Sequence, residues 1–453
     1  MSEPLSGTVA EQSATRLSRL KRWLGLNPNM VVMLTAVLLV GSGEALWSNY
    51  LPKYLQALGA TGWIIGAYGS LAELVRTVYK YPAGWLADWL GRRRVLVLFT
   101  LMATVGYTVY LFSPSWQWVL LGTLFVGVSW KSLTLPGTFS MVGDNLGSNR
   151  RDIGLGLLAL SERVSVVLLA PIGGLLITGS LTLVKQPGQR RAENALQGSD
   201  AVASGLFGPV GGVRVGLGIT MVLALIAIGI IVRYYTDRGS RTRGRPRFSF
   251  ANGWRSLDTH LKWLLAADCL VLWAEWVIKV FIVLFVVDVL GVSAFGFGIL
   301  LTIDTLLGLV LLIPAAKLSE RFGRPPFVLL GYGFWTLFPL VLVSASSLLW
   351  IILAFVVRGL NDIGGPARRA LLVDRARETT RGRVIGTYHL IRGVAIFPAS
   401  LVGGWLWTIS EQLPFYAAFL IGAVGFLTYA MWVRSEKYLR YKSSDQSVYE
   451  KED

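Results

Sequence analysis

Residues 84–94 read Gly84-Trp85-Leu86-Ala87-Asp88-Trp89-Leu90-Gly91-Arg92-Arg93-Arg94, a short polar turn between two long apolar stretches. Gly91 permits a tight turn, Asp88 stands where a helix is expected to end, and the three arginines suit the headgroup layer of a membrane. The flanking stretches, residues 60–82 and 95–112, are each long enough to cross a bilayer as a helix. The stretch therefore predicts membrane helices joined by a short basic turn.

Apolar stretches of this length recur along the whole chain. A helix needs about 20 largely apolar residues to cross the hydrocarbon core. The predicted spans are residues 30–52, 60–82, 95–112, 117–142, 153–178, 212–234, 262–287, 296–316, 327–346, 349–372, 384–408 and 413–433. We expect an all-α membrane protein with twelve transmembrane helices. Its predicted parts are a cytoplasmic N-terminal segment 1–29, a six-helix bundle 30–234, a basic cytoplasmic linker 235–261, a second six-helix bundle 262–434 and a cytoplasmic tail 435–453.

The composition agrees with a surface that faces lipid. Of 453 residues, 53% are hydrophobic and 15% are charged, against roughly 25% charged in soluble domains. The net charge of +17 lies mostly in residues between the apolar spans, so no basic face for nucleic acid is expected. Cys269, His260 and His389 are the only residues of their types. A Cys/His zinc site and a disulfide framework are therefore not expected.

Basic residues concentrate in every second loop. One set of loops holds most of the arginines, including Arg92–Arg94, Arg150, Arg151 and the cluster from Arg238 to Arg247, whereas the alternate loops carry little beyond Lys53 and the Lys185, Arg190 and Arg191 group. Because Lys and Arg stay on the cytoplasmic side, both termini are predicted to be cytoplasmic. We expect a multi-pass protein of the inner or plasma membrane, monomeric and embedded in lipid.

The two halves of the chain resemble each other. A shift of 232 positions superposes the following residues: Gly59 on Gly291, Gly66 on Gly298, Pro82 on Pro314, Leu86 on Leu318, Asp88 on Glu320, Gly91 on Gly323 and Arg92 on Arg324. One unbroken offset through two spans and a loop predicts two pseudo-symmetric bundles with a site between them, as in transporters. The alternative is that Gly and Pro recur in any membrane helix, but charged loop positions coincide as well.

The turn at residues 84–94 and its weaker copy, Ala316-Lys317-Leu318-Ser319-Glu320-Arg321-Phe322-Gly323-Arg324, resemble the loop signature of the major facilitator superfamily. The first copy departs from the family pattern at Trp89, where a basic residue is usual. The resemblance, over about residues 28–434, implies a cytoplasmic gate that holds the two bundles together. The gate residues it implies are Gly84, Asp88, Gly91, Arg92, Asp144, Glu320, Gly323, Arg324 and Asp374. The alternative is that these basic residues only set orientation.

Charged residues also lie within the predicted spans, where a charge is costly and usually faces a partner or a water-filled cavity. Three acid–base pairs stand three or four positions apart and can meet on one helix face. We expect ion pairs between Glu73 and Arg76, Glu275 and Lys279, and Arg358 and Asp362.

Three acids, Glu44, Asp268 and Asp304, have no base at such a spacing. A buried carboxyl without a nearby cation takes up a proton readily, as proton coupling requires, although Asp268 lies nearer the cytoplasmic end and is alternatively only hydrated. Lys131 and Arg392 are the best unpaired bases; they suit an anionic group or a partner acid on another helix. Adding Glu275, next to the repeat counterpart of Glu44, gives the predicted coupling or cavity set: Glu44, Asp304, Glu275, Lys131, Arg392 and Asp268.

The repeat, the loop and the acids within the spans predict a secondary active transporter of a small molecule. The leading form is proton-coupled export of a small organic or drug-like compound; the alternative is proton-coupled uptake of a polar or anionic solute. We find no convergent catalytic groups and no P-loop, so no enzyme, no cofactor and no use of ATP are expected, and the proton gradient is the expected driving force. A receptor or scaffold on the same fold stays open.

Overall fold

The computed structural model describes residues 28–127, 151–184, 208–236, 254–255, 257–375 and 381–449. In the first half these form α2 (Pro28–Trp47), η1 (Ser48–Tyr50), α3 (Leu51–Ala57), α4 (Gly62–Leu90), α5 (Arg92–Leu111), α6 (Trp116–Val126), α9 (Arg151–Thr178) and α12 (Pro209–Tyr234). The second half begins with α14 (Thr259–Ile278), α15 (Ile282–Leu284), η3 (Phe285–Val289), α16 (Ala294–Phe322) and α17 (Arg324–Val343). It ends with α18 (Leu348–Leu360), η4 (Asn361–Ile363), α19 (Gly364–Arg375), α20 (Arg381–Ile396), α21 (Ala399–Ile409) and α22 (Leu413–Tyr449).

The helices of the described residues fall at the twelve predicted spans. Nine are long and apolar enough to cross a membrane, and one further span is a pair bent by 45° between Ile278 and Ile282. The other two are α6, a shorter apolar helix, and α4, whose 29 residues carry charges such as Glu73 and Arg76. The predicted all-α membrane fold is confirmed.

Two predicted spans are interrupted by local sequence. The span at 384–408 divides into α20 and α21 just before Ala399, where Pro398 cannot donate a helical hydrogen bond. The span at 349–372 passes through the short 3-10 segment η4, which is followed by Gly364, Gly365 and Pro366. These breaks change which residues share a helix face, a change that matters for the charged site.

The backbone repeats at the predicted offset. Gly59 and Gly291 have φ values of 83° and 75°, and Gly91 and Gly323 have φ values of 88° and 90°. An L-residue with a side chain rarely adopts these angles, so each pair needs glycine for the same reason. The 232-residue shift therefore superposes equivalent turns of the two halves.

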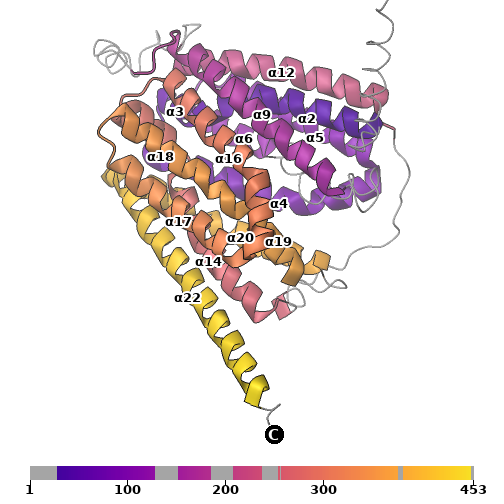
Figure 1. Ribbon diagram of the computed structural model, residues 1–453. Coiled ribbons are helices and arrows are strands. Elements are labelled where there is room, and N and C mark those ends of the chain that lie inside the picture. The colour runs from indigo at the N-terminus through magenta and orange to yellow at the C-terminus, as the bar shows by residue number, and fades with distance from the viewer. Residues whose placement is uncertain are drawn as a thin grey trace, which may run out of the picture.

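The helices form two bundles, which we call the first and second lobes (residues 28–236 and 254–449 as described). In Figure 1 the lobes lie together where α3, α9 and α16 meet, and they diverge toward the α4–α5 turn and the far part of α22. We call the end with residues 58–61, 179–184 and 290–293 the closed end, and the end with Arg92–Arg94 and Arg324 the basic end.

The buried apolar residues follow the same division. At the closed end, one cluster joins both lobes and includes Tyr50 of the first and Phe297 of the second. Nearer the basic end, one described cluster contains residues of the first lobe, from Met30 to Tyr235, and a separate one contains residues of the second, from Leu257 to Trp432. The apolar core is thus continuous between the lobes at the closed end and divided toward the basic end.

Two glycine crossings bring the lobes together at the closed end. A Cβ on Gly174 of α9 would collide with the carbonyl oxygen of Ala294, where α16 begins. A Cβ on Gly404 of α21 would lie 2.8 Å from the carbonyl oxygen of Gly62, where α4 begins. Because Gly62 and Ala294 are 232 positions apart, the two crossings are equivalent under the repeat.

Polar contacts reinforce the closed end. The Tyr50 hydroxyl lies 2.6 Å from the Ala170 carbonyl oxygen and 3.2 Å from that of Ala294, so it bridges α9 and the start of α16. The ammonium group of Lys53 contacts the Asp288 carboxylate at 2.7 Å. Main-chain packing, a buried hydroxyl and an ion pair therefore hold the lobes together here.

Candidate functional site

Asp268 of α14 is surrounded by donors from three other helices. It is 0% exposed, and its Oδ1 accepts from the Tyr332 hydroxyl at 3.0 Å and from Arg368 Nη1 at 2.6 Å. Its Oδ2 accepts from the Tyr388 hydroxyl at 3.0 Å and from Arg392 Nη1 at 3.3 Å. The expectation of a hydrated Asp268 is therefore wrong, and so is that of an unpaired Arg392. Spacing along one helix could not show partners that come from α17, α19 and α20.

A second group of charges lies between the lobes. Asp304 of α16 contacts Arg358 of α18, with Oδ2 and Nη2 3.5 Å apart. Asp362 contacts Arg163 of α9, in the other lobe, with Oδ2 and Nη1 2.6 Å apart. The expected pair of Arg358 with Asp362 is thus replaced by two pairs across helices, and Asp304 is not isolated.

The reason lies in η4 and in one glycine. Asp362 belongs to a 3-10 segment, whose three residues per turn shift it off the face that Arg358 occupies. Gly308 of α16 then leaves room for the new pair, because a Cβ there would overlap Asp362 Oδ2 and lie 2.7 Å from Arg163 Nη1. The contact between lobes therefore depends on a residue without a side chain.

Glu44 is the acid of the first lobe. It is 6% exposed, and its Oε1 accepts from the Tyr107 hydroxyl at 2.8 Å. Trp47, one helix turn away, packs edge-on against Tyr107 and Tyr110 with ring centroids 5.7 Å from each. Glu44 is thus held within an aromatic group between α2 and α5.

The pair of Glu73 with Arg76 is confirmed, with Oε2 and Nη1 2.8 Å apart. The Arg76 guanidinium also lies 5.8 Å from the ring centroid of Trp276, in the second lobe. Lys279 lies over the same ring at 3.7 Å. Two cations from different lobes therefore share one aromatic face, an arrangement typical of cation–π contacts.

Glu275 lines a small cavity in the second lobe. The cavity has a volume of about 60 Å³ and also contacts Tyr332, Asp362 and Arg368. It is therefore bordered both by the partners of Asp268 and by the contact between lobes. This volume is about that of two water molecules, so a proton or water could pass between the two groups but a solute could not.

At the basic end, Arg324 forms an ion pair with Asp374 of α19. This joins the second copy of the loop to α19, a contact within the second lobe. Glu320 is exposed, and Gly91 and Gly323 form matching turns. Lys131 and Asp144 lie outside the described residues, as do the side chains of Gly84 and Asp88. The gate role of these residues and of Arg92 stays a prediction.

Sequence reasoning did not single out Arg163, Arg368 or Tyr107. Their partners are at least 60 positions away, at separations of 199, 100 and 63 residues. The usable signal is polarity alone, because a basic or phenolic side chain in an apolar span needs a partner. Among the described residues no group of three or more His, Cys, Asp or Glu could hold a metal ion.

The model of the Major Facilitator Superfamily matches residues 20–184 and 264–448. Tetracycline resistance protein, class B, of Escherichia coli is 28% identical over 144 residues, which are 32% of this chain and 36% of that protein. Multidrug resistance protein MdtH of Aeromonas hydrophila is 31% identical over 147 residues, 32% of this chain and 37% of that protein. These matches span about a third of either relative.

The fold has the same likeness at lower identity. The crystal structure of the nucleoside transporter NupG aligns with a TM-score of 0.68 at 12% identity, over 90% of this chain and 99% of that one. The family model covers both lobes, and the repeated loop, the helices and their arrangement agree with it. The chain belongs to the major facilitator superfamily.

Proposed function

We propose that the protein is a secondary active transporter that exports a small, partly apolar organic molecule in exchange for protons. The observation that carries this proposal is the pair of carboxylates between the lobes, Asp304 and Asp362, each held by an arginine within apolar helices. Charges at such depth are costly unless they serve a pathway. The family and the fold favour transport.

Proton exchange at Asp362 gives a physical link to lobe movement. When Asp362 accepts a proton, its charge is lost and the ion pair with Arg163 weakens, which loosens a contact between the lobes. When the proton leaves, the pair forms again. Asp304 stands in the same relation to Arg358, so that a cationic solute can replace either arginine as the partner of a carboxylate.

Export is supported by what the relatives are named for. One is a tetracycline resistance protein and another a multidrug resistance protein. Both matches cover about a third of those proteins, so the substrate class of this chain is part of the proposal. Buried aromatic residues beside Glu44, including Trp47 and Tyr107, suit a compound with an apolar portion.

We place the basic end in the cytoplasm, because Lys and Arg gather there. The termini are then both cytoplasmic, and the protein lies in the cell membrane as a monomer. The closed end faces outward, and the divided core at the basic end corresponds to an inward-open conformation. Release of the closed-end contacts would give the outward-open one.

The test is flux in proteoliposomes under imposed pH gradients, with tetracycline and a lipophilic cationic dye as probes. We expect probe movement against the direction of proton flow and loss of this coupling in Asp304→Asn. Glu411→Gln, at an exposed loop position, is the matched control and should behave as the unmodified protein. Flux that ignores both the gradient and Asp304→Asn would refute proton coupling. Uptake of an anionic solute along with protons would favour the alternative direction.

A further inference from the structure

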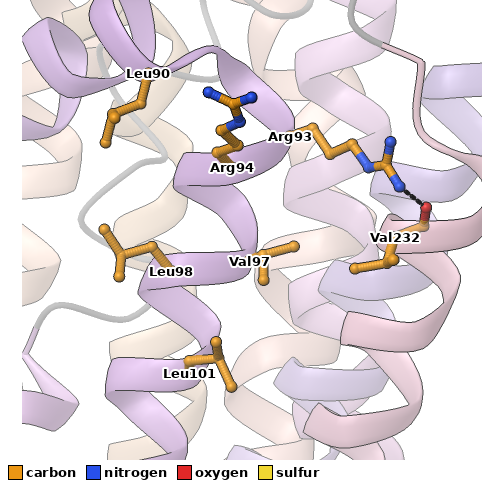
Figure 2. Close-up of a pocket in the computed structure, with 7 residues that line it drawn as sticks. All are labelled: Leu90, Arg93, Arg94, Val97, Leu98, Leu101 and Val232. Carbon is orange, nitrogen blue, oxygen red and sulfur yellow. Dashed lines mark hydrogen bonds between the residues drawn. The ribbon is translucent and has the colours of Figure 1, made fainter.

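A pocket of about 560 Å³ opens on the outer face of the first lobe at the basic end. Figure 2 shows two arginines at one level and apolar side chains farther along α5. The lining residues are Leu90, Arg93, Arg94, Val97, Leu98, Leu101 and Val232. None of them belongs to the charged site between the lobes, so the pocket needs its own explanation.

Arg93 is anchored at this pocket. Its guanidinium donates a hydrogen bond to the carbonyl oxygen of Val232, which lies in the last turn of α12. Carbonyls there have no partner within their own helix, so the arginine ties α5 to α12. A cation is thereby held in place at the mouth of the pocket.

Arg94 follows directly and is exposed. It forms no hydrogen bond or ion pair with another residue that the structure describes. Its side chain points away from Leu98 in Figure 2, toward the level of the α4–α5 turn. Since it stabilises no described contact, its charge is available to a ligand.

The rest of the pocket is apolar and open. Leu98 is 39% exposed, Leu101 is 44% exposed and Val232 is 44% exposed. Leu101 lies seven positions beyond Arg94, or about 10 Å along α5. Two cations above an apolar wall of this depth match a phosphate group with an attached acyl chain, whereas a free phosphate would gain nothing from the wall.

The repeat shows that the turn itself does not need these arginines. Gly91 and Gly323 adopt the same conformation, and Arg92 coincides with Arg324. The next two positions, however, are Arg93 and Arg94 in the first copy but prolines, Pro325 and Pro326, in the second. The double cation is therefore specific to the first lobe.

We propose that this pocket binds an anionic phospholipid, with its phosphate at Arg93 and Arg94 and an acyl chain along Val97, Leu98 and Leu101. Basic pockets beside membrane helices bind anionic headgroups in this way. The inference depends on the membrane fold and not on proton coupling or export. Its failure would leave the proposed transport intact, and loss of transport would leave lipid binding intact.

The experiment is native mass spectrometry of the full chain, titrated with phosphatidylglycerol or phosphatidylcholine of the same acyl chains. We expect phosphatidylglycerol to bind at least tenfold more tightly. Arg94→Gln should remove most of this preference without loss of folded protein, and the double variant Arg93→Gln/Arg94→Gln should weaken phosphatidylglycerol binding by roughly thirtyfold. Arg321→Gln, at an exposed arginine of the second loop copy, is the control and should bind as the unmodified chain.

A second arm identifies the source of the phosphate. Glycerol 1-phosphate, which lacks acyl chains, should displace phosphatidylglycerol only at concentrations at least a hundredfold higher. Equal competition by glycerol 1-phosphate, equal binding of the two lipids, or unchanged binding in Arg94→Gln would each overturn the proposal.

Discussion

Arg163 and Asp362 join the two lobes, with Nη1 and Oδ2 2.6 Å apart near the middle of their spans. The side chains are 28% and 32% exposed, so each charge is partly desolvated and depends on the other. Removal of one partner leaves a charge in an apolar setting, a change that usually costs more than the pair contributes. The pair is therefore suited to register a change of charge at either residue.

The first prediction concerns this pair. Arg163→Gln and Asp362→Asn should each lower the midpoint of thermal unfolding, and the double variant should be less destabilised than the sum. We expect an interaction of about 0.5–3 kcal/mol in the cycle. Additive single effects would show that the contact contributes nothing to stability.

The second prediction concerns the room beneath the pair. Gly308→Ala should destabilise the protein by about 1–3 kcal/mol, because the new methyl overlaps Asp362 and must displace it. Gly229→Ala, in α12, is the control, since a Cβ there meets nothing within 4 Å. Chemical unfolding in detergent compares the two. A Gly308→Ala protein as stable as the control would contradict the packing described.

The third prediction concerns Asp268. Asp268→Asn leaves Arg368 and Arg392 without a counterion inside the second lobe, at an expected cost of about 3–5 kcal/mol. Tyr332→Phe removes one of four donors and should cost only about 0.5–1.5 kcal/mol. Thermal unfolding in the same detergent measures both. Equal losses would mean that charge balance is not what stabilises this group.

The fourth prediction concerns the repeated turn. Gly323→Ala should cost about 1–3 kcal/mol, because φ is 90° there. Gly91→Ala should cost a similar amount, since its φ is 88°. Gly365→Ala, where a Cβ meets nothing within 4 Å, should be near neutral. If only one of the two turns is sensitive, the halves are not equivalent at this point.

Much of the fold could be predicted from the sequence because its signals are local or periodic. The apolar stretches are set by bilayer thickness, and the glycines at a 232-residue offset are set by turn conformation. Pro398 could have indicated the break before α21, but a proline inside a membrane helix is often accommodated. The predicted gate contact of the second loop copy, Arg324 with Asp374, is present as an ion pair.

The charged site was predicted less well, because its partners lie on different helices. Spacing along one helix identified Glu73 with Arg76 but paired Arg358 with the wrong acid. The 3-10 turn at Asp362 and the absence of a side chain at Gly308 decide that pairing. Neither signal points to Arg163, which lies 199 positions away.

The equivalent crossings of Gly174 on Ala294 and of Gly404 on Gly62 have a mechanical consequence. Main chain rests directly on main chain, so there are no rotamers to absorb a partial tilt. Such a seam cannot loosen gradually at one edge; it is either in contact or parted along its length. Because the two seams are related by the repeat, the lobes can swing about a shared axis like the covers of a book.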